Sequence, residues 1–199
     1  MASEYLITLA DIGQIPDLIK GAFLKGHPEQ RIAFVGRSNV GKSSLINALL
    51  EQRIARVSAT PGKTKAIHFF LWKELSKIVV DLPGYGFAQV AKAEKNAWSA
   101  LLDAYFTADR NLQGVLLLFD GRHGPTAQDL EALEFFSARR IPLQIVFTKA
   151  DQLKTQSERS KRKREVLKAL APYGLEEDDP VWVSVKDKRS IKGLKERIL

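Results

Sequence analysis

Short runs of apolar residues alternate along this chain with longer stretches in which apolar and polar positions recur at helical spacing. The runs are apolar at nearly every position, so they predict strands that are buried on both faces of a sheet. Six such strands are expected, at residues 31–35, 66–72, 78–81, 114–120, 144–148 and 181–184. Five helices are expected, at residues 42–51, 94–107, 126–139, 157–170 and 190–199. Thr126 and Ser157 are residue types that cap helix N-termini, and we expect each to cap its own helix.

The order of these elements indicates the topology of the sheet. Strands that alternate with helices are typical of an α/β fold, with a mainly parallel sheet and helices on both of its faces. Only residues 73–77 separate the strands at 66–72 and 78–81, and a parallel crossover needs about a dozen residues or more. We therefore expect a mostly parallel six-stranded sheet with one antiparallel strand. In such sheets ligands bind beyond the carboxyl ends of the strands.

A glycine-rich segment follows the first of these strands and opens the first helix. It fits the phosphate-binding pattern G-x-x-x-x-G-K-[ST], in which backbone N–H groups and a helix N-terminus surround phosphate oxygens. Lys42 is expected to reach the β- and γ-phosphates, and the Ser43 hydroxyl is a candidate Mg²⁺ ligand. The segment consists of Gly36, Arg37, Ser38, Asn39, Val40, Gly41, Lys42 and Ser43. The alternative is a plain glycine turn, which the flanking strand and helix disfavour.

Two further segments are candidates for sensing the metal and the γ-phosphate. A D-x-x-G motif ends another strand and consists of Asp81, Leu82, Pro83 and Gly84. Asp81 is expected to hold Mg²⁺ through water, and the Gly84 N–H to contact the γ-phosphate. The polar loop 60–64 contains two threonines, Thr60 and Thr64, and either hydroxyl could join the Mg²⁺ only while the γ-phosphate is present. Alternatively, this loop is only a Pro-Gly turn.

A fourth segment predicts which base is recognised. The strand at 144–148 ends in an [N/T]-K-x-D pattern, here Thr148, Lys149, Ala150 and Asp151. A carboxylate at Asp151 can accept hydrogen bonds from N1–H and the 2-amino group of guanine, a pair of donors that adenine lacks. Lys149 is expected to pack along the base, and Thr148 to tie this loop to the phosphate-binding loop. An ATP-using kinase would have to bind adenine in spite of Asp151. At the end of the last strand, Ser184, Val185 and Lys186 loosely match the loop whose backbone N–H meets guanine O6. Nucleotide contacts are expected there at Val183, Ser184 and Val185.

Composition and charge narrow the class of protein. The 199 residues include no cysteine, which excludes disulfide frameworks, thiol catalysis and cysteine zinc sites. No apolar run approaches the roughly 18 residues of a membrane-spanning helix, and residues 1–11 lack the basic start of a signal peptide. We therefore expect a cytoplasmic protein without a membrane anchor. The net charge of +8 and the pI near 9.7 favour polyanionic partners, with a generally basic surface as the alternative.

Taken together, the motifs closely resemble the EngB (YihA/YsxC) family of bacterial P-loop GTPases, from about residue 31 to the C-terminus. The segments Pro61-Gly62-Lys63-Thr64 and Pro83-Gly84-Tyr85-Gly86 distinguish this family from its relatives. The resemblance implies a GTPase domain at residues 31–199 and an N-terminal extension, residues 1–30, that packs on it or flanks it. The last loop departs from the family, because Val183, Ser184 and Val185 stand where consecutive serines are usual.

The same resemblance implies roles for individual residues. It implies Ser43 and Thr64 as Mg²⁺ ligands, with Asp81 acting through water. Lys42, Thr64 and Gly84 are implied to support hydrolysis. Further nucleotide contacts are implied at Gly62, Lys63, Thr64, Lys65 and Ala66.

The resemblance also implies GTP and GDP as ligands and a switch role in the assembly of the large ribosomal subunit, with an associated requirement in cell division and septation. The expected partner is a ribosomal precursor or its rRNA rather than DNA, and we expect a monomer. A direct divisome- or membrane-associated regulator is the alternative function. Candidates for the rRNA contact, although such runs are usually solvated helix faces, are Arg159, Lys161, Arg162, Lys163 and Arg164.

Two positions bear on hydrolysis. Tyr85 directly follows the D-x-x-G motif, where Ras-type enzymes carry a glutamine that orients water. Because tyrosine has no amide, we expect slow intrinsic turnover, with the missing group supplied from elsewhere. Asn39 resembles the potassium-coordinating asparagine of some related GTPases, and a K⁺ ion there could replace an arginine finger. The alternative for Asn39 is a hydrogen bond that shapes its loop.

Overall fold

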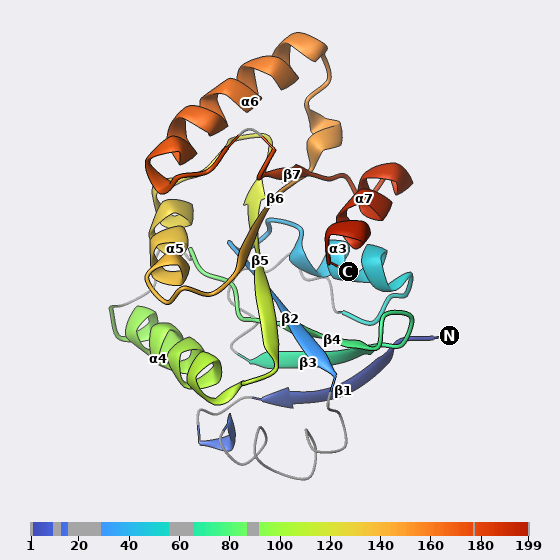
Figure 1. Cartoon of the computed structure of the whole chain (residues 1–199), viewed down its shortest axis with the longest axis vertical. Helices are drawn as coiled ribbons and strands as arrows, with labels where there is room; N and C mark the ends of the chain where they lie inside the picture. The colour runs from blue at the N-terminus through green and yellow to red at the C-terminus, as the bar shows by residue number, and fades with distance from the viewer. Residues whose placement is uncertain are drawn as a thin grey trace.

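The computed structural model describes residues 2–9, 13–15, 29–55, 66–86, 92–176 and 178–198 of the chain. Among these residues, seven strands form one sheet in the spatial order β1-β3-β4-β2-β5-β6-β7 (Figure 1). The predicted α/β class with a mostly parallel sheet is confirmed, and each of the six predicted strands has a counterpart. The strands are β1 (Glu4–Leu9), β2 (Gln30–Gly36), β3 (Ile67–Trp72), β4 (Lys77–Asp81), β5 (Leu112–Asp120), β6 (Leu143–Thr148) and β7 (Val181–Trp182).

β3 is the antiparallel strand that the short connection to β4 requires. It pairs antiparallel with β4, whereas β2 pairs parallel with β4 and with β5, and the parallel arrangement continues through β6 to β7. β1 is an additional strand that the pattern did not predict, and it pairs antiparallel with the other side of β3. Only Leu9 of β1 is fully buried, as its position at the edge of the sheet allows.

The five predicted helices are present, with ends within two residues of those expected. Two of them, α3 and α7, lie on one face of the sheet, and the other three lie on the opposite face (Figure 1). Two short 3₁₀ helices, η1 (Ala150–Gln152) and η2 (Ala171–Tyr173), follow β6 and α6. The helices are α3 (Lys42–Leu50), α4 (Lys92–Ala108), α5 (Ala127–Ser137), α6 (Gln156–Leu170) and α7 (Lys188–Ile198).

One of the two predicted helix caps is correct and one is wrong. Thr126 caps α5, where its side chain accepts a hydrogen bond from the Asp129 N–H and the Asp129 carboxylate accepts from the Thr126 N–H. Ser157 does not cap α6. Thr155 caps that helix, because the acidic residue Glu158 stands three positions after it and completes the reciprocal capping box.

Each face of the sheet has its own buried core. Ile32 and Phe34 of β2 pack with α3 and α7, while the alternate residues Ala33 and Val35 belong to the core under α4, α5 and α6, as the two-residue period of a strand requires. The strand register then aligns the ends of β2, β4, β5 and β6 at one edge of the sheet. The segments that carry the predicted motifs therefore meet there.

A candidate nucleotide-binding site

The turn from β2 into α3 has a backbone that depends on glycine. A Cβ atom on Gly36 would come within 2.9 Å of Leu118 and Val40, and Gly41 has a φ of 105° at the N-cap of α3. Asn39 also has a positive φ, 63°, which asparagine tolerates better than most residues. The first N–H groups of α3 lack partners within the helix, and no side chain caps it. This turn can therefore receive an anion at the helix N-terminus.

Lys42 and Asp81 lie next to each other at the start of α3 and the end of β4. The Lys42 ammonium contacts Asp81 Oδ1, and the two side chains are 10% and 6% exposed. Ser43 follows Lys42 in the first turn of the same helix. A phosphate held by Lys42 and a cation held by Asp81 and Ser43 would consequently be neighbours.

The D-x-x-G segment is fastened to the phosphate-binding turn by its backbone. The Ser38 N–H donates to the Tyr85 carbonyl at 3.0 Å, and the Tyr85 N–H donates to the Gly36 carbonyl at 3.4 Å. A Cβ atom on Gly84 would lie 2.8 Å from the Gly36 oxygen, a distance at which the backbone would have to move. Glycine is therefore required at position 84, because the segment after β4 lies directly against the turn from β2 into α3.

The side chain of Tyr85 is buried and is directed toward α5. Its hydroxyl donates a 2.9 Å hydrogen bond to Asp129 Oδ1, and its ring lies edge-on to Trp98 of α4 with centroids 6.0 Å apart. Burial, together with the Asp129 carboxylate, raises the pKa of Tyr85 well above its usual value. The residue after D-x-x-G is thus part of the packing between the loop, α4 and α5. No motif in the sequence pointed to this contact with Asp129.

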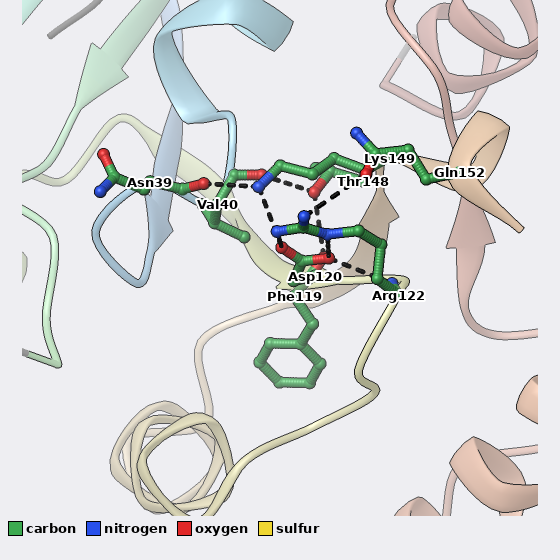
Figure 2. A network of polar contacts seen from close by, with 8 residues as sticks. All are labelled: Asn39, Val40, Phe119, Asp120, Arg122, Thr148, Lys149 and Gln152. Atoms are coloured by element: carbon green, nitrogen blue, oxygen red, sulfur yellow. Dashed lines mark hydrogen bonds and ion pairs between the residues drawn. The ribbon is translucent and has the colours of Figure 1, made fainter. Parts of the chain in front are cut away.

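The loop that follows β6 is joined to the phosphate-binding turn, as the sequence predicted for Thr148. The Thr148 hydroxyl donates to the Val40 carbonyl at 2.6 Å. Lys149 adds a second connection, because its ammonium donates to the Asn39 carbonyl at 2.7 Å (Figure 2). Two side-chain contacts therefore join the loop after β6 to the turn from β2 into α3.

Asp151 lies beside the loop after β7, which the sequence assigned to guanine O6. Asp151 Oδ1 accepts a 2.8 Å hydrogen bond from the Ser184 hydroxyl, and Oδ2 is 3.1 Å from the Lys186 ammonium. Partial burial raises the pKa of Asp151, but the bonds from Ser184 and Lys186 outweigh it, so that the pKa is lowered. Val183 is buried and Val185 is 48% exposed. The structure thus brings Asp151 and the predicted Val183–Val185 segment together.

Asp120 is a residue of this region that none of the sequence motifs includes. It ends β5, pairs in register with Thr148, and its side chain is only 5% exposed. The Arg122 guanidinium contacts both carboxylate oxygens, and the Lys149 ammonium lies 2.9 Å from Oδ2 (Figure 2). Burial raises the pKa of Asp120, but Arg122 and Lys149 overcome it and hold the pKa far below the usual range. The sequence could have pointed to Asp120 as a site residue, because it ends an apolar strand just as Asp81 does.

A cavity of about 730 Å³ adjoins Asp151 between α6 and the segment from β7 to α7. Arg159, Lys163 and Arg164 line it from α6, and Ser184 and Trp182 line it from β7 and the loop that follows. The Arg162 side chain, by contrast, makes contacts within the protein. It donates to the His123 carbonyl at 2.9 Å and pairs with Glu165 at 2.7 Å.

The predicted switch loop, residues 60–64, lies outside the described residues. Thr60, Gly62, Lys63 and Thr64 belong to this loop, Lys65 lies outside the described residues as well, and Ala66 is described just before β3. In the described part of the chain, no cluster of three or more histidine, aspartate or glutamate side chains is arranged to hold a metal ion. Every helix there is too short or too polar to cross a lipid bilayer.

Comparison with protein families gives a match over residues 31–149, to a family described as "50S ribosome-binding GTPase". A protein of Thermotoga maritima named "Probable GTP-binding protein EngB" is 46% identical over 162 residues, which cover 81% of this chain and 77% of that protein. A protein of the same name from Shewanella denitrificans is 41% identical over 192 residues, covering 96% of this chain and 82% of the other.

Solved structures give the same picture. The crystal structure of "a probable GTP-binding protein engB" superimposes with a TM-score of 0.59 at 27% identity, covering 84% of this chain and 96% of that one. Era from Aquifex aeolicus, solved with GDP and aluminium fluoride, has a TM-score of 0.61 at 21% identity over 84% of this chain and 55% of its own. The likeness to Era concerns the fold alone.

Proposed function

Because this chain belongs to the EngB family of GTP-binding proteins and is a P-loop GTPase, we propose that it is a guanine-nucleotide switch in the assembly of the large ribosomal subunit. The observation that carries the proposal is the convergence of three loops at one edge of the sheet. Backbone and side-chain contacts fasten the segment after β4 and the loop after β6 to the phosphate-binding turn. Bound nucleotide would then contact all three loops at once.

In this proposal residues 36–43 surround the phosphates, and the Lys42 ammonium contacts the β- and γ-phosphates. Mg²⁺ fits the oxygen donors present, the Ser43 hydroxyl and the Asp81 carboxylate, because it prefers hard oxygen ligands and keeps several waters. Asp81 would act through water, and Thr64 would complete the set. When bound, Mg²⁺ neutralises charge on the phosphate oxygens. Gly84 would supply an N–H toward the γ-phosphate, and its lack of a Cβ allows the segment after β4 to lie against the Gly36 carbonyl.

Base selection is proposed to depend on Asp151. Its carboxylate is ionised, is only 23% exposed, and is held by Ser184 and Lys186. It can accept from guanine N1–H and the 2-amino group, whereas adenine would leave it without donors, at a large cost. Lys149 would lie along one face of the base, and the backbone of Val183, Ser184 and Val185 would meet O6.

Hydrolysis is proposed to be slow without an activator. Tyr85, the residue after D-x-x-G, has no side-chain amide to orient water, and its hydroxyl is engaged by Asp129. Asn39 is exposed and its carbonyl accepts from Lys149, which leaves its side chain available to a K⁺ ion. The positive φ of Asn39 supports the alternative, in which asparagine serves the shape of the turn.

The ribosomal partner is proposed to bind at the basic side of α6. The family description names the 50S ribosome, and three cationic residues of α6 line the cavity beside Asp151, namely Arg159, Lys163 and Arg164. Lys163 and Arg164 are exposed, so phosphate groups of rRNA could reach them. Because ribosomes assemble in the cytoplasm, the protein would act there, and a septation requirement would follow indirectly.

Co-sedimentation tests this function directly. Large-subunit precursor particles are mixed with the protein and GTP, GDP or a non-hydrolysable GTP analogue, and pelleted through sucrose. We expect the protein to pellet with the particles in GTP or the analogue and to remain in the supernatant with GDP. Equal pelleting in all nucleotides would argue against a switch, and recovery with membrane vesicles instead would favour the divisome-associated alternative.

A further inference from the structure

The ammonium of Lys149 is held from two sides. One bond goes to the Asn39 carbonyl at 2.7 Å and the other to Asp120 Oδ2 at 2.9 Å (Figure 2). The Asn39 contact reaches the phosphate-binding turn and the Asp120 contact reaches the end of β5. Lysine has several rotatable bonds, so ordering such a side chain costs conformational free energy. Two acceptors on separate elements restrict where this side chain can lie.

Asp120 is itself rigidly held. Arg122 donates to it three times, from its backbone N–H at 3.1 Å, from Nε at 2.9 Å to the same oxygen, and from Nη2 at 2.7 Å to the other oxygen. Arg122 is 38% exposed and Asp120 only 5%, so the carboxylate is largely shielded from water. Both oxygens are therefore fixed, and a charge-assisted bond in such surroundings is stronger than an exposed one.

The backbone aligns Asp120 with the end of β6, the strand that directly precedes Lys149. Asp120 is paired with Thr148 across β5 and β6, and the Gly121 N–H donates to the Thr148 carbonyl at 2.9 Å. A Cβ atom on Gly121 would stand 2.6 Å from that carbonyl, so only glycine allows this approach. The distance between Asp120 and the Lys149 backbone is thus set by the sheet and not by flexible loops.

From these contacts we infer that Asp120, braced by Arg122, is a positioning residue for guanine recognition, acting on the base through Lys149. Asp120 does not touch the nucleotide. It fixes the ammonium so that the methylene stem of Lys149 lies ready to cover one face of the guanine, which reduces the ordering cost at binding. The inference rests on the proposed base site, and it assigns to the end of β5 a part in nucleotide affinity.

A double-mutant cycle on GDP binding tests the inference. The variants are Asp120→Asn, Lys149→Met and the two combined, and the readout is the Kd of a fluorescent GDP analogue. Asp120→Asn keeps an acceptor but removes the charge, so we expect a Kd about tenfold higher, mainly through faster dissociation. In the Lys149→Met background, the same change should alter the Kd by less than about twofold. A merely structural role would give the same factor in both backgrounds and overturn the inference.

A second variant covers the possibility that Asp120→Asn fails to fold. Arg122→Gln removes the bracing guanidinium at a half-exposed position, and we expect a severalfold higher Kd that also vanishes in the Lys149→Met background. Asp103→Asn is the matched control, since Asp103 pairs with Arg139 on the surface of α4, at 2.6 Å and 47% exposure. Its Kd should stay within about twofold of the parent.

Failure of the inference can be told from failure of the proposed site. If Lys149→Met weakens GDP binding while Asp120→Asn and Arg122→Gln do not, Asp120 has no positioning role and the base site stands. If Lys149→Met leaves the GDP Kd unchanged, both the base site as proposed and the role of Asp120 are wrong.

Discussion

The hydroxyl of Tyr85 donates a 2.9 Å hydrogen bond to Asp129, a residue whose other carboxylate oxygen caps the first turn of α5. The segment after Asp81 is thereby connected to a helix on the far side of the loop. In the same region Trp98 of α4 donates from Nε1 to the Pro83 carbonyl at 2.9 Å. A displacement of this segment toward a γ-phosphate would therefore strain contacts with both α4 and α5.

Replacing Tyr85 tests whether this side chain has a catalytic or a packing role. We expect Tyr85→Phe to lower the free energy of unfolding by about 1–2 kcal/mol, because a buried bond to a carboxylate is lost, with GTP turnover little changed. Tyr85→Gln should not accelerate hydrolysis, since its side chain would point to Asp129. Urea denaturation and single-turnover GTP hydrolysis measure the two effects. A tenfold higher rate of GTP hydrolysis in Tyr85→Gln would contradict the packing role.

Gly84 should tolerate no side chain. In Gly84→Ala the new Cβ would meet the Gly36 carbonyl oxygen at 2.8 Å, so the two loops must separate. We expect stability to fall by about 1–3 kcal/mol and GTP hydrolysis to fall at least about tenfold. Gly193→Ala is the control, because Gly193 lies in α7 and a methyl group added there would have no neighbour within 4 Å. That variant should be as active as the parent and up to about 1 kcal/mol more stable.

Asp151 should decide the choice of base. Asp151→Asn replaces an acceptor with a donor amide opposite the 2-amino group of guanine, so we expect GDP affinity to fall about 100-fold or more. Xanthosine diphosphate, which carries a carbonyl at that position, should gain affinity. Competition against labelled GDP measures both. Glu196→Gln, at a surface pair with Lys192, serves as the control, and ATP that competed as well as GTP with the unaltered protein would refute the base assignment.

The pKa of Asp120 predicts how stability depends on pH. Although burial raises this pKa, it is lowered in the folded protein because the ionised carboxylate is bonded to Arg122 and Lys149. The contribution of these bonds to the free energy of unfolding is therefore complete above the unfolded-state pKa near 3.9, and it is lost as pH falls through the lower folded-state pKa. We expect the difference in unfolding free energy between the parent and Asp120→Asn to be constant from about pH 5 to 7 and to shrink toward pH 2. Urea denaturation at several pH values measures it. A difference that grew at low pH would be inconsistent with this ion pair.

Charge reversal on α6 should separate partner binding from nucleotide binding. We expect Lys163→Glu combined with Arg164→Glu to weaken co-sedimentation with ribosomal particles and to make it less sensitive to salt, because fewer phosphate contacts release fewer counterions. GDP affinity should stay within about twofold. Arg162→Glu is the informative contrast, since it breaks the bond to the His123 carbonyl and should lower stability instead. Lost GDP binding in the double variant would point to a structural role for these side chains.

Much of the site could be predicted because its residues occupy repeated positions at the ends of apolar strands. Gly36 ends β2, Asp81 ends β4 and Thr148 ends β6, and the structure brings these ends to one edge. Even the tie from Thr148 to the phosphate-binding turn was predictable. Buried strands appear in the sequence as continuous apolar runs, so the order of strands and helices along the chain indicates the topology of the sheet.

The remaining features depend on contacts that a linear pattern does not record. Ser157 and Thr155 are both capping residue types, and the reciprocal bonds between Thr155 and Glu158 favour Thr155. Asp120 is held by Arg122, two residues later, and by Lys149, which directly follows the next strand, β6. The direction of the Tyr85 side chain follows from the partner on α5, which is remote in sequence.

The position of β1 determines which strand of the sheet is exposed to other protein chains. β3 reads Ile67-His68-Phe69-Phe70-Leu71-Trp72, and without β1 its backbone would offer an unsatisfied, apolar ladder to any neighbouring chain. Six residues near the N-terminus occupy that ladder, while the opposite border of the sheet is the two-residue β7. β1 thus takes the place of the more buried and more apolar β3 at this border of the sheet, where another chain could otherwise pair with it.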